Sequence, residues 1–490
     1  MTLAALMIPL LGGLVLGLSS LKFPLSPNLL SQRAIALLVT ILTFVIAIFL
    51  PGSESVERTW IPSFGAYFSL SANGAGSVLV LASSLVMIPV VLCAGLRIRE
   101  RTGAFLSLLL FMQAGLNGLF LAKDLVLFYV FWEATLIPSL LMLGIWGRNG
   151  RRQATIKYLI YAVAGSLLML VTVLAIKPIS GAESYRLADL LVATTTLSLK
   201  TQVWLFLGFS VAFMVKLPLW PLHSWLADFH TQNHPSGVAD VAGTLYKVGG
   251  YGFFAWALPL LPAAAVTVGP FLLILAAFTA IYGAMVAIAQ NELKRLLAFA
   301  SISHMGIVGV GLFGLHLAGL NGAVYLLAAQ MFTTGGLFLI SGMLFERQGS
   351  FKLDKYGGLA ASAPALAAVT LFILFASIGV PGLANFPGEF LSLVGAFQAN
   401  PVAAALAVLA VIAAGVYGVN LFQRLYQGNQ GKPVRDISPM ELFVLVPILS
   451  GILWLGVAPA PQLEQIESQS RVIVDQVKAS PSGLAVGGDR

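Results

Sequence analysis

Long apolar runs separated by short polar segments follow one another along the whole sequence. Each run is long enough to cross roughly 30 Å of hydrocarbon as a helix. We expect about fourteen spans, at residues 3–20, 33–50, 75–97, 104–121, 124–146, 155–176, 202–222, 236–259, 264–289, 294–316, 319–345, 363–398, 402–427 and 438–458. The pattern therefore predicts an all-α integral membrane protein, embedded in a lipid bilayer, without a soluble domain of any size.

Two of these spans contain residues that interrupt a helix. The seventh includes VKLPLWPLHSW, with Pro218 and Pro221, and the twelfth includes SIGVPGLANFPGEF. Proline removes a helical hydrogen bond, and a membrane tolerates such breaks only where protein or water satisfies the freed carbonyls. The breaks fall on the fourth member of two five-span blocks, 104–259 and 264–427. This spacing predicts two inverted five-helix repeats around a transport path, with helices 7 and 12 broken.

The ends of the chain complete this division. Residues 1–103 form three N-terminal spans, and residues 428–490 form a last span followed by an amphipathic tail. In that tail one helical face carries Leu463, Ile466, Ile473 and Val477, so we expect a surface helix. About 17 of the 27 Lys and Arg residues follow odd-numbered spans, which predicts that the odd-numbered loops face the cytoplasm and both termini the opposite side.

Composition narrows the function classes. With 58% hydrophobic and only 9% charged residues, the chain has too little polar surface to cover a soluble globule. The net charge of +8 is scattered between apolar runs, which argues against nucleic acid as a partner. The single cysteine, Cys93, excludes an internal disulfide and a cysteine-based metal or iron–sulfur site within the chain. We expect no cofactor.

A few ionisable residues lie inside the predicted spans, where a charge costs roughly 2.5 to 3.5 kcal/mol. The clearest are Glu133, Lys216, Lys247 and Glu389. Near span ends or in broken segments lie His223, His230, Lys294 and His304. A lysine near a span end usually extends to the headgroups, and a lone histidine is usually a helix-contact residue, so both readings stay open for Lys294 and His304.

Charge pairing suggests what these residues do. A buried lysine tends to lose its proton, and a carboxylate within about 4 to 6 Å restores it. Movement of Glu133 toward or away from Lys216 would therefore make the lysine take up or release a proton. Carboxylates and lysines in this arrangement predict a proton relay.

A metal site is the weaker interpretation. The segment HSWLADFHTQNHP places His230 and His234 four residues apart, as in some zinc sites. It follows a proline break and lacks the glutamate of an HExxH motif. The sequence also contains neither a Walker loop nor a GxGxxG motif after a strand, so nucleotide binding is not supported.

At this point the residues resemble a known family. FYVFWEATLIP, FMVKLPLWPLHSWLADFHTQ, VAGTLYKVGGYG, NELKRLLAFASISHMG, SGMLFER and NFPGEF are similar to successive signatures of the antiporter-like proton-channel subunits of complex I and the photosynthetic NDH complexes. The resemblance covers roughly residues 75–460 and is strongest to the NuoM/NdhD branch, chain 4 of NAD(P)H-quinone oxidoreductase. Mrp-type sodium/proton antiporter subunits share the glutamate and lysines, but SWLADFH and PGEF fit the complex I branch better.

The resemblance implies roles for particular residues. Glu133 corresponds to the family's ion-pair glutamate, Lys216 to its partner and Lys247 to the central-axis lysine. Glu389 corresponds to the exit-side glutamate, and His304 matches a histidine of the same axis. Where a histidine is expected in the eleventh span, the chain has Gln330, which does not titrate. A relay there would run through water alone.

The function implied by the resemblance is proton translocation coupled to quinone reduction within a multi-subunit NAD(P)H or ferredoxin:quinone oxidoreductase. Other membrane subunits would supply the redox energy. The Gln330 departure and the NHPSGVAD stretch favour a CO2-uptake variant in a cyanobacterial thylakoid membrane, with a CO2-hydration partner protein. The alternative location is a bacterial plasma membrane. The rival functions are an Mrp-type cation/proton antiporter and a non-pumping structural subunit.

Overall fold

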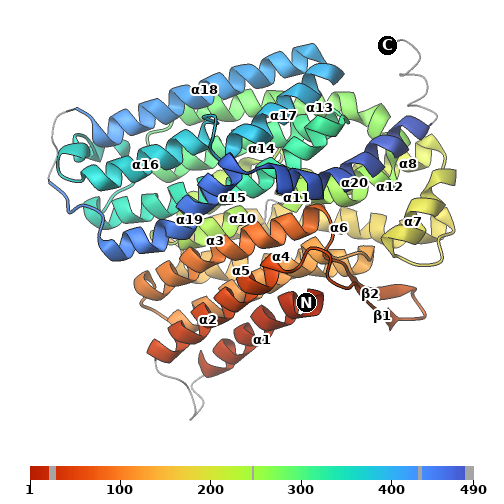
Figure 1. Cartoon of the computed structure of the whole chain (residues 1–490), viewed down its shortest axis with the longest axis horizontal. Coiled ribbons are helices and arrows are strands. Elements are labelled where there is room, and N and C mark those ends of the chain that lie inside the picture. The colour runs from red at the N-terminus through yellow and green to blue at the C-terminus, as the bar shows by residue number, and fades with distance from the viewer. Residues whose placement is uncertain (21–28, 246–247, 429–432, 481–490) are drawn as a thin grey trace.

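The computed structural model describes residues 1–20, 29–245, 248–428 and 433–480 as a bundle of helices (Figure 1). Within these ranges, 12 helices are long and apolar enough to cross a membrane. They are α1 (Thr2–Ser20), α2 (Leu29–Ile48), α3 (Ala75–Arg97), α4 (Thr102–Leu121), α5 (Leu125–Trp146), α6 (Arg151–Ser180), α8 (Leu199–Lys216), α13 (Pro262–Ile288), α14 (Leu293–Phe313), α15 (Leu317–Gln348), α18 (Pro401–Tyr426) and α19 (Pro439–Val457). The all-α membrane class is confirmed.

The two remaining predicted spans are divided between shorter elements. Residues 236–259 fall on α10 (Val238–Leu245), α11 (Val248–Gly252), a π-helical turn η2 (Phe253–Ala257) and α12 (Leu258–Leu260). Residues 363–398 fall on α16 (Pro364–Ser377) and α17 (Asn385–Ala399). The seventh span ends with α8, and the chain resumes as α9 (Ser224–Gln232). Both predicted helix breaks are thus present, whereas the additional division of residues 236–259 was not predicted.

The second break is built around glycine. Gly379 has a φ of 76°, in the left-handed region that glycine adopts without strain. A Cβ atom at this position would lie 2.2 Å from Oε2 of Glu389. The glycine therefore ends one helix and leaves room for the carboxylate of the next.

Two helices form the centre of the bundle. Every residue in the apolar windows of α14 and α15 is buried. Around them, α13 packs on α14 and α18, α15 packs on α17, and α1 packs on α4 toward the other edge (Figure 1). Polar residues within these windows of α14 and α15 are consequently shielded by protein.

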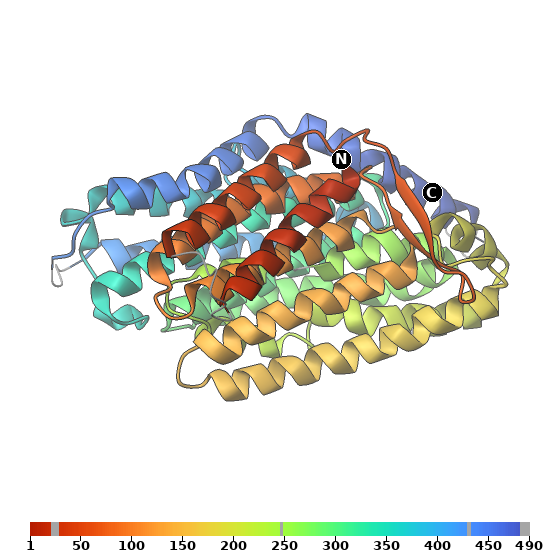
Figure 2. The ribbon, with the colours of Figure 1, turned by 90° about the horizontal axis from the view of Figure 1, so that it is seen from below.

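A short antiparallel hairpin precedes α3 and was not predicted. It consists of β1 (Val56–Ile61) and β2 (Ala66–Leu70) and runs along the outside of the bundle (Figure 2). Further short elements are α7 (Leu187–Ala193) and the 3₁₀ turns η1 (Thr194–Thr196), η3 (Leu353–Lys355) and η4 (Leu359–Ala361). The hairpin escaped prediction because two strands of this length do not stand out beside apolar runs.

The C-terminal helix α20 (Ala460–Ala479) is amphipathic, as predicted. Ile466 and Ile473 are buried, and Leu463 and Val477 pack against the same core. The helix lies across α15 and α3. The backbone N–H of Ala75, at the start of α3, donates to Oε1 of a glutamine on α20 at 2.9 Å.

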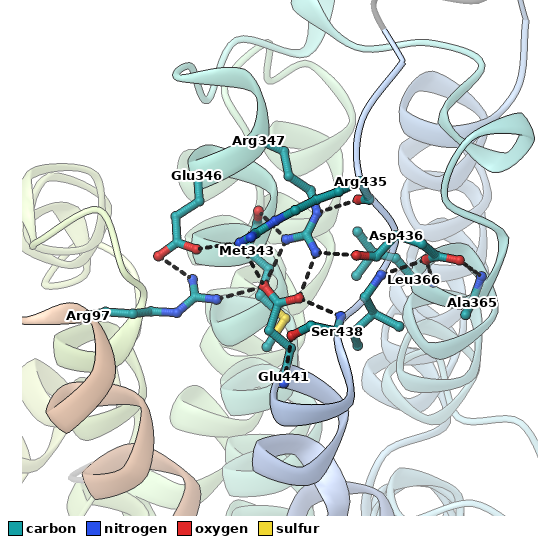
Figure 3. Close-up of polar contacts among 11 residues, drawn as sticks. Arg97, Met343, Glu346, Arg347, Ala365, Leu366, Arg435, Asp436, Ser438 and Glu441 are labelled. Atoms are coloured by element: carbon teal, nitrogen blue, oxygen red, sulfur yellow. Dashed lines mark hydrogen bonds and ion pairs between the residues drawn. The ribbon is translucent and has the colours of Figure 1, made fainter.

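A network of charged side chains joins the ends of three spans (Figure 3). Arg97 of α3 lies 3.0 Å from Glu346 of α15 and 3.1 Å from Glu441 of α19. Arg347 of α15 contacts Glu441 at 2.7 Å. Glu441 also belongs to a capping box with Ser438 at the start of α19. The network fixes the relative positions of α3, α15 and α19 at one membrane face.

Asp436 extends this contact to the broken twelfth span. Its carboxylate accepts hydrogen bonds from the backbone N–H groups of Ala365 and Leu366, at 3.0 and 2.9 Å, in the first turn of α16. Burial alone would raise the pKa of Asp436, but these hydrogen bonds outweigh burial and hold the pKa below its usual value. The carboxylate therefore stays ionised and caps the helix.

Asp124 connects the hairpin to the spans. Its buried carboxylate accepts from the backbone N–H groups of Val126 and Leu127, at 2.9 and 3.0 Å, and so caps α5. It also accepts from the backbone N–H of Tyr67 in β2 at 3.0 Å. One side chain thus satisfies donors from two elements.

Replacement of Asp124 by Ala should lower the unfolding temperature of this subunit in the purified complex. The change removes an N-cap, worth about 0.5 to 2 kcal/mol, and leaves the hairpin N–H without its acceptor. Asp124→Asn keeps an acceptor oxygen and should therefore lower the unfolding temperature less than Asp124→Ala does. Equal unfolding temperatures for Asp124→Ala and the unchanged protein would contradict this role.

Candidate functional site

Glu133 and Lys216 come from adjacent parts of α5 and α8. Lys216 is the last residue of α8 and is 3% exposed. Its Nζ lies 5.6 Å from the ring centroid of Trp132 and 5.9 Å from that of Tyr158. Lys216 thus packs against aromatic side chains of α5 and α6. The pairing of Glu133 with Lys216 stays a prediction.

A second cluster links α9, α10 and α14. Nζ of Lys294 lies 2.6 Å from Oδ2 of Asp240, and Nδ1 of His230 lies 3.1 Å from Oδ1 of the same carboxylate. All three side chains are 0% exposed. The ring of His230 also stacks on Phe338 of α15. Lys294 is thus an internal ion-pair residue, and its headgroup-facing interpretation is wrong.

Backbone groups complete the surroundings of Lys294. Its Nζ donates to the carbonyl oxygens of Asn233 and His234 at 3.2 and 2.9 Å. The side chain of Asn233 donates to Asp240 at 3.3 Å. Burial, and next the charge of Lys294, lower the pKa of His234 to about 4, so this imidazole is neutral at pH 7.

A third cluster links α14, α17 and α18. Nδ1 of His304 lies 3.1 Å from Oε1 of Glu389, and both side chains are buried. Nε2 of His304 lies 3.0 Å from the hydroxyl of Tyr417. Asn385 donates to Glu389 at 3.5 Å and to the carbonyl of Ser377 at 2.8 Å. His304 is therefore held at both nitrogens, rather than serving as a simple helix-contact residue.

Gln330 lies on α15 and is completely buried. Its Oε1 accepts a hydrogen bond from Thr334, one turn along the helix. The neighbouring Thr333 donates to Asn385 at 3.1 Å, which connects α15 to the Glu389 cluster. Whether Gln330 alters a relay stays a prediction.

The three histidines of the possible zinc motif have separate partners. Nε2 of His223 lies 3.3 Å from the Tyr282 hydroxyl, His230 contacts Asp240, and His234 contacts Ser236 at 2.9 Å. Within the described ranges, no group of three or more His, Cys, Asp or Glu side chains is arranged to hold a metal ion. Lys247 lies outside the described residues.

Sequence reasoning missed two members of these clusters. Asp240 lies in the predicted span 236–259, where a charge is as costly as it is at Glu133. The same signal could therefore have identified it. Tyr417 gave no comparable signal, because a tyrosine in an apolar run is common. Its contact with His304 arises only when α18 packs beside α14.

The arrangement is suited to moving protons. The second and third clusters each combine a histidine or lysine side chain with a carboxylate that can stabilise its charged form. The clusters lie on different helices and are enclosed by apolar side chains, where an unpaired charge is costly. Proton transfer within such a cluster needs only small shifts of side chains or water.

Comparisons with known proteins agree with this geometry. Residues 122–414 match the family model described as NADH:quinone oxidoreductase/Mrp antiporter, transmembrane. The chain is 43% identical to NADH-quinone oxidoreductase subunit 13 of Thermus thermophilus, covering 87% of this chain and 91% of that protein. It is 35% identical to NADH-quinone oxidoreductase subunit M of Rhodobacter capsulatus, covering 93% of each.

Solved structures show the same likeness. A chain of respiratory complex I from Thermus thermophilus with bound NADH superposes with a TM-score of 0.91 at 40% identity, covering 97% of this chain and 100% of that one. A chain of the Mrp complex from Dietzia has a TM-score of 0.82 at 20% identity and shares the fold. The chain therefore belongs to the NADH:quinone oxidoreductase/Mrp antiporter transmembrane family, as an antiporter-like membrane subunit of the complex I subunit M type.

Proposed function

We propose that this chain translocates protons across a membrane, driven by quinone reduction in partner subunits of the same complex. The observation that carries the proposal is the buried contact of His304 with Glu389 on one side and Tyr417 on the other. An imidazole held at both nitrogens can accept a proton at one and release it at the other. The chain itself performs no redox chemistry.

The other two clusters supply further proton-binding groups in the same bundle. Lys294 and His230 share the carboxylate of Asp240, and Lys216 lies buried at the end of α8. We assign Glu133 the role of tuning Lys216, because movement of a carboxylate changes how firmly a buried lysine holds its proton. Lys247, which lies outside the described residues, keeps its proposed role as the central-axis lysine.

NADH is the electron donor that we propose for the assembly. The names of the Thermus and Rhodobacter relatives support it, because both are NADH-quinone oxidoreductase subunits. A CO2-uptake form in a thylakoid membrane, with ferredoxin as donor, remains the finer alternative. Mild purification of the tagged chain separates the two, since recovery of a CO2-hydration protein would favour the CO2-uptake form.

The rival functions make different predictions. An Mrp-type antiporter would show transport that depends on sodium ions. If the chain were only a structural subunit, the complex would transport protons equally well after its buried charged residues were replaced. Proton uptake by reconstituted vesicles, followed with and without sodium, distinguishes these candidates.

Glu133→Gln and Lys216→Met should each reduce proton pumping by reconstituted complex. Loss of one partner of a buried pair costs on the order of 3 to 5 kcal/mol when the pair is dry, and less when water reaches it. Because the two residues act as a unit, the double variant should pump no worse than the more damaged single variant. Additive defects, or normal pumping by Glu133→Gln, would refute the assigned role.

Asp240→Asn should lower the unfolding temperature of the subunit strongly, because it leaves the buried Lys294 cation without its counter-ion. The matched control is Asp228→Asn. Asp228 pairs with Lys157 at 2.7 Å, but these side chains are 35% and 37% exposed. The control substitution should lower the free energy of unfolding by only about 0 to 1 kcal/mol. Equal losses in the two variants would show that burial does not set the strength of the Asp240 contact.

Tyr417→Phe removes the hydroxyl that contacts His304 and keeps the ring. We expect slower proton pumping with normal assembly, since one nitrogen of His304 loses its partner. Tyr426→Phe is the control. Tyr426 lies on the same helix as Tyr417, but its hydroxyl contacts Thr370 of α16 at 2.7 Å, outside the cluster. If both variants pump at the same rate, Tyr417 has only a packing role.

A further inference from the structure

A polar cavity of about 840 Å³ opens beside the Lys294 cluster. Its walls come from the end of α9 and from the segments that follow α5, α13 and α15. All four segments are odd-numbered loops of the predicted topology, so the cavity faces the side predicted to be cytoplasmic. Residues that matter below are Arg148, Gln232, Glu292, Phe351 and Lys352.

Phe351 stands between this cavity and the buried cluster. Phe351 is one of the residues that line the cavity, yet it is only 2% exposed. Cζ of Arg148 lies 5.2 Å from the ring centroid, and Nζ of Lys294 lies 5.1 Å from it. Arg148 is 34% exposed, whereas Lys294 is fully buried. The same ring therefore contacts an accessible cation and an inaccessible one.

Backbone contacts hold Phe351 in this position. The backbone N–H of Leu293 donates to the carbonyl of Phe351 at 2.9 Å, one residue before Lys294. Glu292 and Lys352 form an antiparallel bridge beside it. The ring also stacks on Phe345 of α15 at 4.6 Å. The loop is thus tied to the first turn of α14 and to the end of α15.

The cavity wall is tied to the same cluster. Arg148 pairs with Glu292 at 3.0 Å and donates to the carbonyl of Thr231 at 3.0 Å. The backbone N–H of Arg148 donates to the carbonyl of Gln232 at 2.7 Å. Gln232 directly precedes Asn233, whose carbonyl accepts from Lys294. Wall and cluster are therefore only one residue apart along the chain.

We propose that Phe351 is the barrier that controls access of water and protons from this cavity to the Lys294–Asp240–His230 cluster. The proposal rests on the proposed function, because it makes the cluster the first proton-binding group inside the cavity. An apolar constriction excludes water until it moves. Cations on the ring stabilise the closed position through cation–π contacts. Displacement of the ring would connect the cavity to Lys294.

The test uses the native lysine as a probe of access. The intact complex, in vesicles that expose the cavity, is treated with the water-soluble acetylating reagent sulfosuccinimidyl acetate. Peptide mass spectrometry then measures how fast Lys294 is acetylated. We expect slow acetylation in the unchanged protein and in Phe351→Leu, which keeps an apolar bulk. Phe351→Ala should be acetylated severalfold faster at Lys294.

Two lysines serve as internal references. Lys352 is exposed at the rim of the cavity and should react at the same rate in all variants. Lys216 is buried elsewhere and should stay protected. Equal Lys294 rates in Phe351→Ala and the unchanged protein would overturn the proposal. So would a parallel rise at Lys216, because that would indicate general loosening.

If Phe351→Ala does not assemble, Phe351→Val provides a smaller reduction in bulk and should give an intermediate Lys294 rate. An unchanged rate in that variant would equally overturn the barrier. Acetylation does not depend on pumping, so failure of the barrier is distinguishable from failure of the proposed function. The latter is decided by the Glu133 and Lys216 variants.

Discussion

The cost of holding charge in an apolar interior shapes this structure more than any other constraint. Asp240 is completely buried and contacts both a lysine and a histidine, and Glu389 contacts a histidine at similar depth. An isolated charge at these positions would lose its hydration without compensation. The paired arrangement keeps charged groups inside the bundle, which is the condition for carrying protons through it.

The helix breaks serve the same requirement. At the second break, a glycine with positive φ leaves space for the Glu389 carboxylate. At the first break, the chain leaves α8 directly after Lys216 and returns as α9, which carries His230. Continuous helices would direct these side chains differently and would not place backbone carbonyls beside Lys294. Irregular backbone is thus concentrated where polar groups need partners.

Rigid attachments surround the sites where small movements are expected. The network of Arg97, Arg347 and Glu441 anchors three helix ends, and α20 lies across the bundle at α3 and α15. Within this frame, the buried ion-pair contacts are short. Nζ of Lys294 lies 2.6 Å from Oδ2 of Asp240, and Nδ1 of His304 lies 3.1 Å from Oε1 of Glu389.

The sequence by itself determined the membrane class, the approximate positions of the spans, both helix breaks and the amphipathic C-terminal helix. These features follow from local hydrophobic pattern and from proline and glycine chemistry. It also marked Glu133, Lys216, His230, Lys294, His304 and Glu389 as unusual, because charge within an apolar run is costly wherever it lies. The short motifs also identified the complex I antiporter-like family, subunit M branch.

Only the tertiary structure decided which of these residues meet. Asp240 contacts both His230 and Lys294, although the three residues lie on three different helices. Tyr417 reaches His304 across 113 positions of the sequence. Helix packing sets such contacts, and one sequence contains no measure of the distance between its helices. Likewise, the position of Phe351 between an open cavity and a buried lysine depends on how four loops converge.

The cavity exists only in the folded bundle, because no single loop contains all the residues that line it.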